Sequence, residues 1–163
     1  MSTAIDTAPA SLTGAPAFVA RIIRWLDAVP YSLLAILPRL AVAQVFWSSG
    51  QTKLADWGAT IQLFEEEYKV PLLPPDIAAH LAASIELSMP VLLVLGLFTR
   101  FAALVLLGMT TFIEVFVYPQ AWPTHIQWAA MLVFLLFRGP GKLSLDELIA
   151  RWASSRAARA YLT

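Results

Sequence analysis

Four long hydrophobic stretches constrain this chain more than any other feature of its sequence. They cover residues 31–49, 78–98, 101–118 and 124–137. A helix that crosses a bilayer needs about 20 predominantly apolar residues, and each stretch approaches or reaches that length. Only Thr99 and Arg100 separate the second stretch from the third, so these two helices must be antiparallel neighbours. The sequence therefore predicts an all-α membrane protein with a four-transmembrane-helix bundle over residues 30–143.

The composition agrees with this prediction and excludes several other classes of protein. Of the 163 residues, 59% are hydrophobic and 13% are charged, whereas soluble domains have about 45–50% apolar and about 25% charged residues. Basic and acidic residues are equal in number, so no nucleic-acid partner is expected. Without cysteines and with only two histidines, the chain is not expected to form disulfides, a thiol nucleophile or a metal site of its own.

The distribution of basic residues predicts how the bundle is oriented. If all four stretches cross the membrane, eight Lys and Arg residues lie on the side of the two termini. The opposite side holds Lys53 and Lys69, and Arg39 lies within the first stretch. Because basic residues are concentrated in cytoplasmic segments, both termini are expected in the cytoplasm.

Three segments outside the bundle complete the predicted organisation. Residues 1–16 carry neither basic residues nor an apolar run, which is typical of a disordered tail. Residues 17–29 and 144–163 each combine an apolar stripe with arginines, the pattern of an amphipathic helix. Two interpretations of both helices stay open: they lie on the cytoplasmic membrane surface, or they pack against the ends of the bundle.

Two ionisable residues in the predicted spans are the first functional candidates, because a charge in the bilayer costs roughly 2.5 kcal/mol or more. At about 1.5 Å of rise per residue, Arg39 and Glu86 are expected at similar depths, where they would form an ion pair near mid-membrane. This pair is either structural or the floor of a polar pocket that opens outward. With Gln44 and Lys53, it forms the predicted cofactor-binding set.

A second predicted pair, Glu114 and His125, lies nearer the outer surface and supplies the catalytic candidates. A carboxylate beside an imidazole can hold or transfer a proton near neutral pH. A hydrogen-bonded cap on a short fourth helix would have the same sequence signature, so a structural role is the alternative.

Several short segments, taken in order, resemble the DoxX family of small four-helix bacterial membrane proteins. They include Phe46–Gly50 followed by Lys53, Leu95–Arg100, Gly139–Gly141 and Ser144–Asp146. The resemblance implies a bacterial inner membrane and an association with quinone-linked sulfur-compound oxidation or with oxidative-stress complexes. Since the chain has no cysteine, sulfur or thiol chemistry would require a redox partner protein or a bound cofactor.

The leading hypothesis is an inner-membrane subunit of a redox complex with a quinone site. Arg39 and Glu86 would orient the quinone head group, while Glu114 and His125 would exchange protons with the outside. One alternative is a non-catalytic scaffold or anchor for partner proteins. Another is a small-solute transporter, suggested by the acidic run Glu65–Glu67 in the outer loop. The sequence leaves open whether the chain is an enzyme subunit and whether it forms a homo-oligomer in the lipid bilayer.

Overall fold

The computed structural model describes residues 15–160, and every regular element in that range is helical. The chain divides into two compact units, residues 1–30 and 31–163. The first unit contains α1 (Ala15–Asp27), whose side chains Phe18 and Trp25 are exposed. The tail predicted for residues 1–16 lies outside the described residues, except that its last two residues begin α1.

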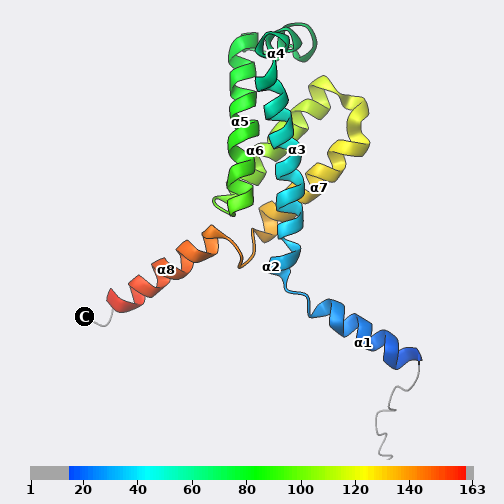
Figure 1. The fold of residues 1–163 in the computed structure, drawn as a ribbon, viewed down its shortest axis with the longest axis vertical. Helices are drawn as coiled ribbons and strands as arrows, with labels where there is room; N and C mark the ends of the chain where they lie inside the picture. Colours follow the sequence, from blue (N-terminus) through cyan, green and yellow to red (C-terminus); the bar gives the residue numbers. More distant parts are fainter. Residues whose placement is uncertain (1–14, 161–163) are drawn as a thin grey trace, which may run out of the picture. The chain divides into compact units, whose positions relative to one another are not determined.

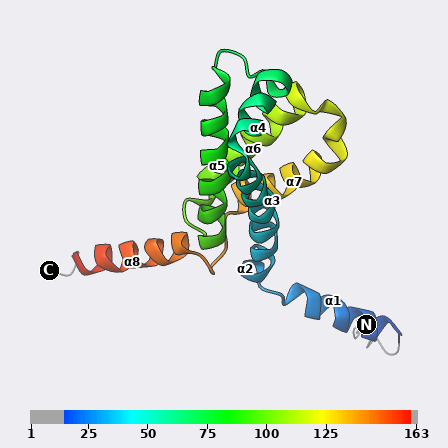
Figure 2. The ribbon, with the colours of Figure 1, turned by 45° about the horizontal axis from the view of Figure 1, so that its top comes forward.

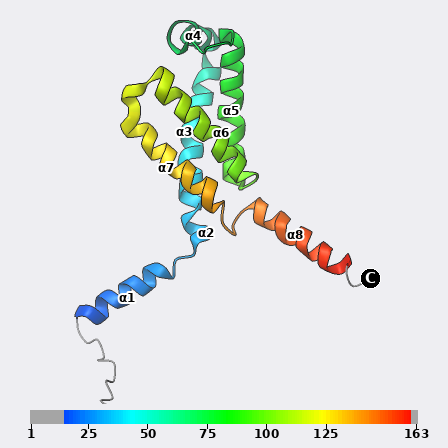
Figure 3. The same ribbon diagram turned by 180° about the vertical axis from the view of Figure 1, so that it is seen from behind.

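Four helices make up most of the second unit. They are α3 (Ile36–Ala55), α5 (Pro75–Leu95), α6 (Thr99–Phe112) and α7 (Trp122–Arg138). Helix α3 packs along α5, α5 packs on α6, α6 packs on α7, and α7 returns to α3 (Figures 1 and 3). The remaining elements are α2 (Tyr31–Leu34), α4 (Trp57–Leu63), the π-helices η1 (Phe64–Tyr68) and η2 (Ile113–Val117), the 3₁₀-helix η3 (Pro119–Ala121), and α8 (Leu145–Ala160).

Three helical segments of the described chain are long and apolar enough to cross a membrane: Tyr31–Ala55, Pro75–Leu95 and Thr99–Val117. They correspond to the first three predicted stretches, so the prediction of an all-helical membrane protein is confirmed at this level. Helix α7 corresponds to the fourth stretch. It has 17 residues, a length of roughly 25 Å.

The first long helix continues beyond its predicted end at Ser49, and Gly50 explains the difference. The sequence prediction ended the helix at this glycine, but Gly50 lies inside α3, against α5. A Cβ added there would stand 2.9 Å from Leu87 Cδ2 and 3.1 Å from Glu86 Cβ. Glycine therefore permits a close approach of the two helices. Helix α3 extends to Ala55, and it carries Lys53 beyond the contact.

The apolar core lies where α3, α5, α6 and α7 meet. Its buried members are Val42, Ala43, Phe46, Leu93, Ala102, Ala103, Leu106, Leu132 and Leu135. The two alanines near the start of α6 allow the neighbouring helices to pack closely. Large apolar side chains such as Leu104 and Phe116 are more than half exposed, which is the pattern expected of helices that face lipid.

Two prolines, one next to Arg39 and one a turn after Glu86, remove a backbone hydrogen bond from their helices. Pro38 has no amide hydrogen for the carbonyl of Leu34, and the helical run is interrupted at Ala35, between α2 and α3. Pro90 lies buried inside α5 and cannot donate the usual hydrogen bond to the carbonyl of Glu86. The backbone of α5 is thus altered one turn beyond its buried carboxylate.

Candidate functional site

The polar contacts that join different helices of the second unit lie toward two opposite ends. At one end α3 and α6 finish and α5 and α7 begin, beneath α4, η1 and η2 (Figure 2); we call this the α4 end. At the other, the α8 end, α5 finishes, α6 begins and the linker of residues 139–144 leads from α7 into α8.

Three side chains form a buried cluster below the α4 end, and we call Ser49, Lys53 and Glu86 the Lys53 cluster. The ammonium of Lys53 lies 2.8 Å from Glu86 Oε1 and 3.1 Å from Ser49 Oγ. Ser49 Oγ in turn donates to Glu86 Oε1 over 3.0 Å. Lys53 is 7% exposed and Glu86 is 2% exposed. Because the pair is almost completely desolvated, each charge depends on the other for compensation.

One oxygen of the Glu86 carboxylate is incompletely satisfied. Oε2 is buried and accepts no hydrogen bond from the described residues. A buried oxygen without a partner costs free energy, and groups of this kind in a native structure are commonly functional. In the Lys53 cluster, Glu86 Oε2 can therefore still accept a hydrogen bond.

The predicted ion pair between Arg39 and Glu86 is wrong. Arg39 is buried, 4% exposed, but it lies near the start of α3 at the α8 end. Its Nε donates to Leu93 O over 2.7 Å and its Nη2 donates to Val94 O over 2.6 Å. Leu93 lies seven residues beyond Glu86, which is roughly 10 Å along α5. Arg39 therefore does not form the floor of a polar pocket with Glu86.

Arg39 instead fastens the linker to the helices. Its Nη1 donates to Leu143 O over 2.8 Å and to Pro140 O over 3.3 Å. Four of the five guanidinium N–H donors are thus used by backbone carbonyls. Asp146 of α8 also binds the start of α6: its carboxylate accepts hydrogen bonds from the amides of Phe98 (2.8 Å) and Thr99 (3.0 Å).

A hollow of about 450 Å³ adjoins the Lys53 cluster at the α4 end. It is lined by Ser49, Thr52, Lys53, Asp56, Ala59, Thr60, Leu63 and Tyr68. Five of these eight side chains carry a hydroxyl or a carboxylate, and one carries an ammonium. The hollow is large enough for a small ring compound and offers convergent polar groups, which is typical of a ligand site.

Glu114 and His125 are in contact, as the sequence predicted. His125 Nδ1 lies 2.6 Å from Glu114 Oε2, and the imidazole is buried at 6% exposed. Glu114 belongs to the π-helical turn η2, and π-turns occur frequently at functional sites. The imidazole also contacts the ring of Trp128, with centroids 5.0 Å apart. The short distance allows a proton to be held between the carboxylate and the imidazole.

Tyr118, Glu67 and Tyr68 join the two π-helical turns, and sequence reasoning missed this contact. The Tyr118 hydroxyl donates to Glu67 Oε1 over 2.5 Å, and its ring meets that of Tyr68 edge-on at 5.9 Å. From the sequence alone, the acidic run is associated with the transporter alternative, and Glu67 is exposed. Tyr68 also lines the hollow. No spacing rule in the sequence relates residues 67 and 118, because the contact depends on how η1 meets η2.

Alkaline pH is expected to weaken this contact. Burial, together with the hydrogen bond to Glu67, raises the pKa of Tyr118 well above its ordinary value. A raised pKa in the folded state means that the stabilisation is complete below about pH 10, where free tyrosine ionises, and is lost at higher pH. At pH 8, Tyr118→Phe is expected to lower the free energy of unfolding by about 1 kcal/mol.

The difference in the free energy of unfolding between wild type and Tyr118→Phe should shrink as the pH rises above about 10. Denaturant unfolding in detergent at a series of pH values measures it, and phenolate absorbance reports the ionisation directly. Tyr161→Phe, a change in a tyrosine beyond the described residues, serves as the reference. A difference that is constant across this pH range would contradict the assignment.

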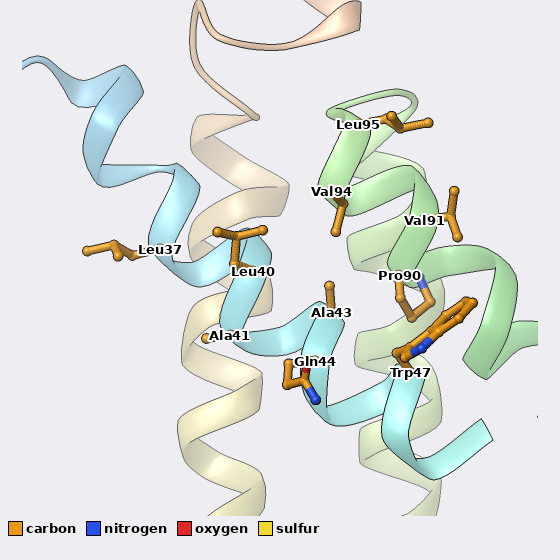
Figure 4. A pocket seen from close by; sticks show the side chains of 10 residues that line it. All are labelled: Leu37, Leu40, Ala41, Ala43, Gln44, Trp47, Pro90, Val91, Val94 and Leu95. Carbon is orange, nitrogen blue, oxygen red and sulfur yellow. The ribbon is translucent and has the colours of Figure 1, made fainter. Parts of the chain in front are cut away.

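Gln44 lies apart from the other predicted ligand residues. It borders a groove of about 750 Å³ between α3 and α5 (Figure 4). The other lining residues are Leu37, Leu40, Ala41, Ala43, Trp47, Pro90, Val91, Val94 and Leu95. The four predicted cofactor-binding residues are therefore distributed over three places: Lys53 and Glu86 in one cluster, Arg39 at the α8 end and Gln44 in the groove.

Comparison with known proteins gives two matches. A family model described as DoxX matches residues 34–119, a range that contains Arg39, Gln44, the Lys53 cluster and Glu114. An "Uncharacterized protein" of Haemophilus influenzae is 34% identical over 131 residues, which cover 71% of this chain and 83% of that protein. No solved structure matches.

Proposed function

The chain belongs to the DoxX family, and on this premise we propose that it is an integral membrane subunit of a quinone-linked redox complex. In this proposal it crosses a bacterial inner membrane four times, with α7 as the fourth span and both termini in the cytoplasm. The excess of Lys and Arg on the side of the termini supports this orientation. The α4 end, with the hollow, then faces outward.

The observation that carries the proposal is the buried Lys53 cluster beside the hollow. A quinone head group carries two carbonyl oxygens, which accept hydrogen bonds from an ammonium or a hydroxyl. Lys53 and Ser49 both border the hollow and supply such donors. Glu86 does not itself line the hollow, but it contacts Lys53 and Ser49, which do. Its Oε2 has no partner among the described residues and would accept a hydrogen bond from a hydroxyl of the reduced ring. Lys53 and Glu86 are thus the proposed head-group ligands, and Arg39 is assigned a structural role.

Reduction of a quinone to a quinol takes up two electrons and two protons. Glu114 and His125 would exchange the protons with the external phase, because an imidazole gains and loses a proton near neutral pH. Tyr118, at the end of η2, contacts Tyr68, which lines the hollow, and these two tyrosines would extend this route. The electrons would come from a redox partner protein, since this chain contains no cysteine to undergo thiol oxidation.

Glu86→Gln and Glu114→Gln test the two proposed roles separately. Glu86→Gln is expected to weaken binding of a short-tailed benzoquinone about tenfold, the effect of roughly 1.4 kcal/mol. Glu114→Gln is expected to leave binding unchanged and to alter the pH dependence of quinone reduction in native membranes. Quenching of tryptophan fluorescence in nanodiscs measures binding. Val133→Ala, on the exposed side of α7, is the control. Unchanged binding and reduction in both variants would remove the proposal.

A scaffold function is the second candidate, because all the hydrogen bonds of Arg39 go to backbone carbonyls of α5 and of the linker that leads into α8. The two functions differ in what the protein retains when it is purified from its native membrane in mild detergent. Stoichiometric quinone together with a redox partner, identified by mass spectrometry, supports the redox subunit. A partner protein with lipid but without quinone supports the scaffold.

A further inference from the structure

The groove between α3 and α5 contains the amide of Gln44, at a depth where lipid hydrocarbon has no hydrogen-bonding groups. Gln44 is the fourteenth residue of the 25-residue helical run Tyr31–Ala55, roughly 16 Å or more from either end. Its side chain is exposed. Its amide nitrogen donates to Ser48 Oγ over 3.0 Å, within the same helix. The amide oxygen and the second N–H have no partner among the described residues.

An unpartnered amide in hydrocarbon is unfavourable by several kcal/mol per group, so a membrane-embedded surface of this kind is normally covered. Apolar side chains of both α3 and α5 surround Gln44 in the groove. Pro90, Val91 and Val94 form its wall on α5 (Figure 4). Whatever covers the groove must therefore supply both a hydrogen-bonding group at the level of Gln44 and apolar atoms around it.

We propose that a second copy of this chain occupies the groove, with the Gln44 amides of the two copies hydrogen-bonded to each other. Copies inserted in the same orientation are related by a two-fold axis along the membrane normal, so each residue meets residues of its own depth. An amide has both a donor and an acceptor, and two glutamines thus close a pair of hydrogen bonds. This proposal does not rest on the redox function.

A two-fold interface brings the same surface of each copy together. Leu37 and Leu40 line the groove on the α3 side and are 68% and 48% exposed. Ala41 lies on the exposed side of α3 next to Gln44 and leaves room for a second helix to approach. Each copy therefore presents exposed apolar side chains around its glutamine.

Cysteine cross-linking tests the interface against a clean background, because the chain contains no cysteine. Single cysteines at Ala41 and Ser48 are expected to give disulfide-linked dimers when membranes are treated with a mild oxidant. Cysteines at Leu104 on α6 and Val133 on α7, which are also exposed, serve as matched controls and are expected to stay monomeric. Equal cross-linking at all four positions would overturn the proposal.

Gln44→Leu tests the hydrogen bonds themselves, with Gln44→Asn as the conservative comparison. Gln44→Leu is expected to raise the dimer dissociation constant about tenfold, whereas Gln44→Asn keeps most of the affinity. Photobleaching of singly labelled protein in vesicles at increasing lipid-to-protein ratio gives the dimer fraction. A monomeric wild type at every ratio overturns the proposal. So does a lipid-soluble molecule retained by monomeric wild type and lost from Gln44→Leu in native mass spectrometry.

Discussion

Lys53→Met is expected to destabilise the protein by roughly 3–5 kcal/mol, the loss that follows when one partner of a buried ion pair is removed. Glu86 would keep only the hydrogen bond from Ser49 while remaining 2% exposed. The double variant Lys53→Met/Glu86→Met is expected to recover most of the lost stability, because two apolar side chains of similar volume need no compensation. Unfolding in mixed detergent micelles measures all three proteins.

The double variant also separates the two candidate functions. If the Lys53 cluster binds a quinone head group, the protein should fold and lose quinone binding. If the pair only fixes the register of α3 and α5, the folded double variant should keep the activity of wild type in cells. A single variant, Lys53→Met, that is as stable as wild type would contradict the ion pair itself.

The second large effect is expected at Arg39. Arg39→Met removes the donor from four backbone carbonyls, three of them within 2.8 Å. Hydrogen bonds from a charged group contribute about 1.5–3 kcal/mol each, and a total loss of at least 3 kcal/mol is expected. Arg39→Lys should recover only part of it, because a single ammonium cannot reach both α5 and the linker as the planar guanidinium does.

The linker should become accessible to protease at the same time. Limited proteolysis of Arg39→Met is expected to produce cleavage within residues 139–144 that wild type resists. Arg151→Met is the matched control, since Arg151 is exposed and forms an ion pair with Glu147 one turn away. Such surface pairs contribute less than about 1 kcal/mol. Equal stability of the Arg39 and Arg151 variants would contradict the structural role of Arg39.

The helices themselves could be predicted from the sequence because hydrophobic length is a property of one segment at a time. Three predicted stretches correspond to candidate spans: the first begins at the predicted residue, and the other ends are displaced by one to six residues. The contact between Glu114 and His125 was also predictable. Only residues 118–121 separate η2 from α7, so the short connection places residues on either side of it at one level.

The partners of the buried charges could not be predicted in the same way. The expected Arg39–Glu86 pair rested on depths counted from assumed helix ends, and α5 begins three residues before its assumed start. Whether Lys53 reaches Glu86 depends on the rotation of α3 and on the close approach at Gly50. That approach is a property of two helices together. A glycine in one sequence segment is equally consistent with the end of a helix.

The pairing of Lys53 with Glu86 has a consequence for the order of events during biosynthesis. The two residues are 33 positions apart, and α3 leaves the ribosome before α5. Alone, each charge opposes entry of its helix into the bilayer by roughly 2.5–3.5 kcal/mol. Lys53, two residues from the end of α3, can keep its ammonium at the interface until α5 follows. Lys53 therefore reaches its buried position only after α5 has entered, and a chain arrested between the two helices should hold the ammonium at the membrane surface.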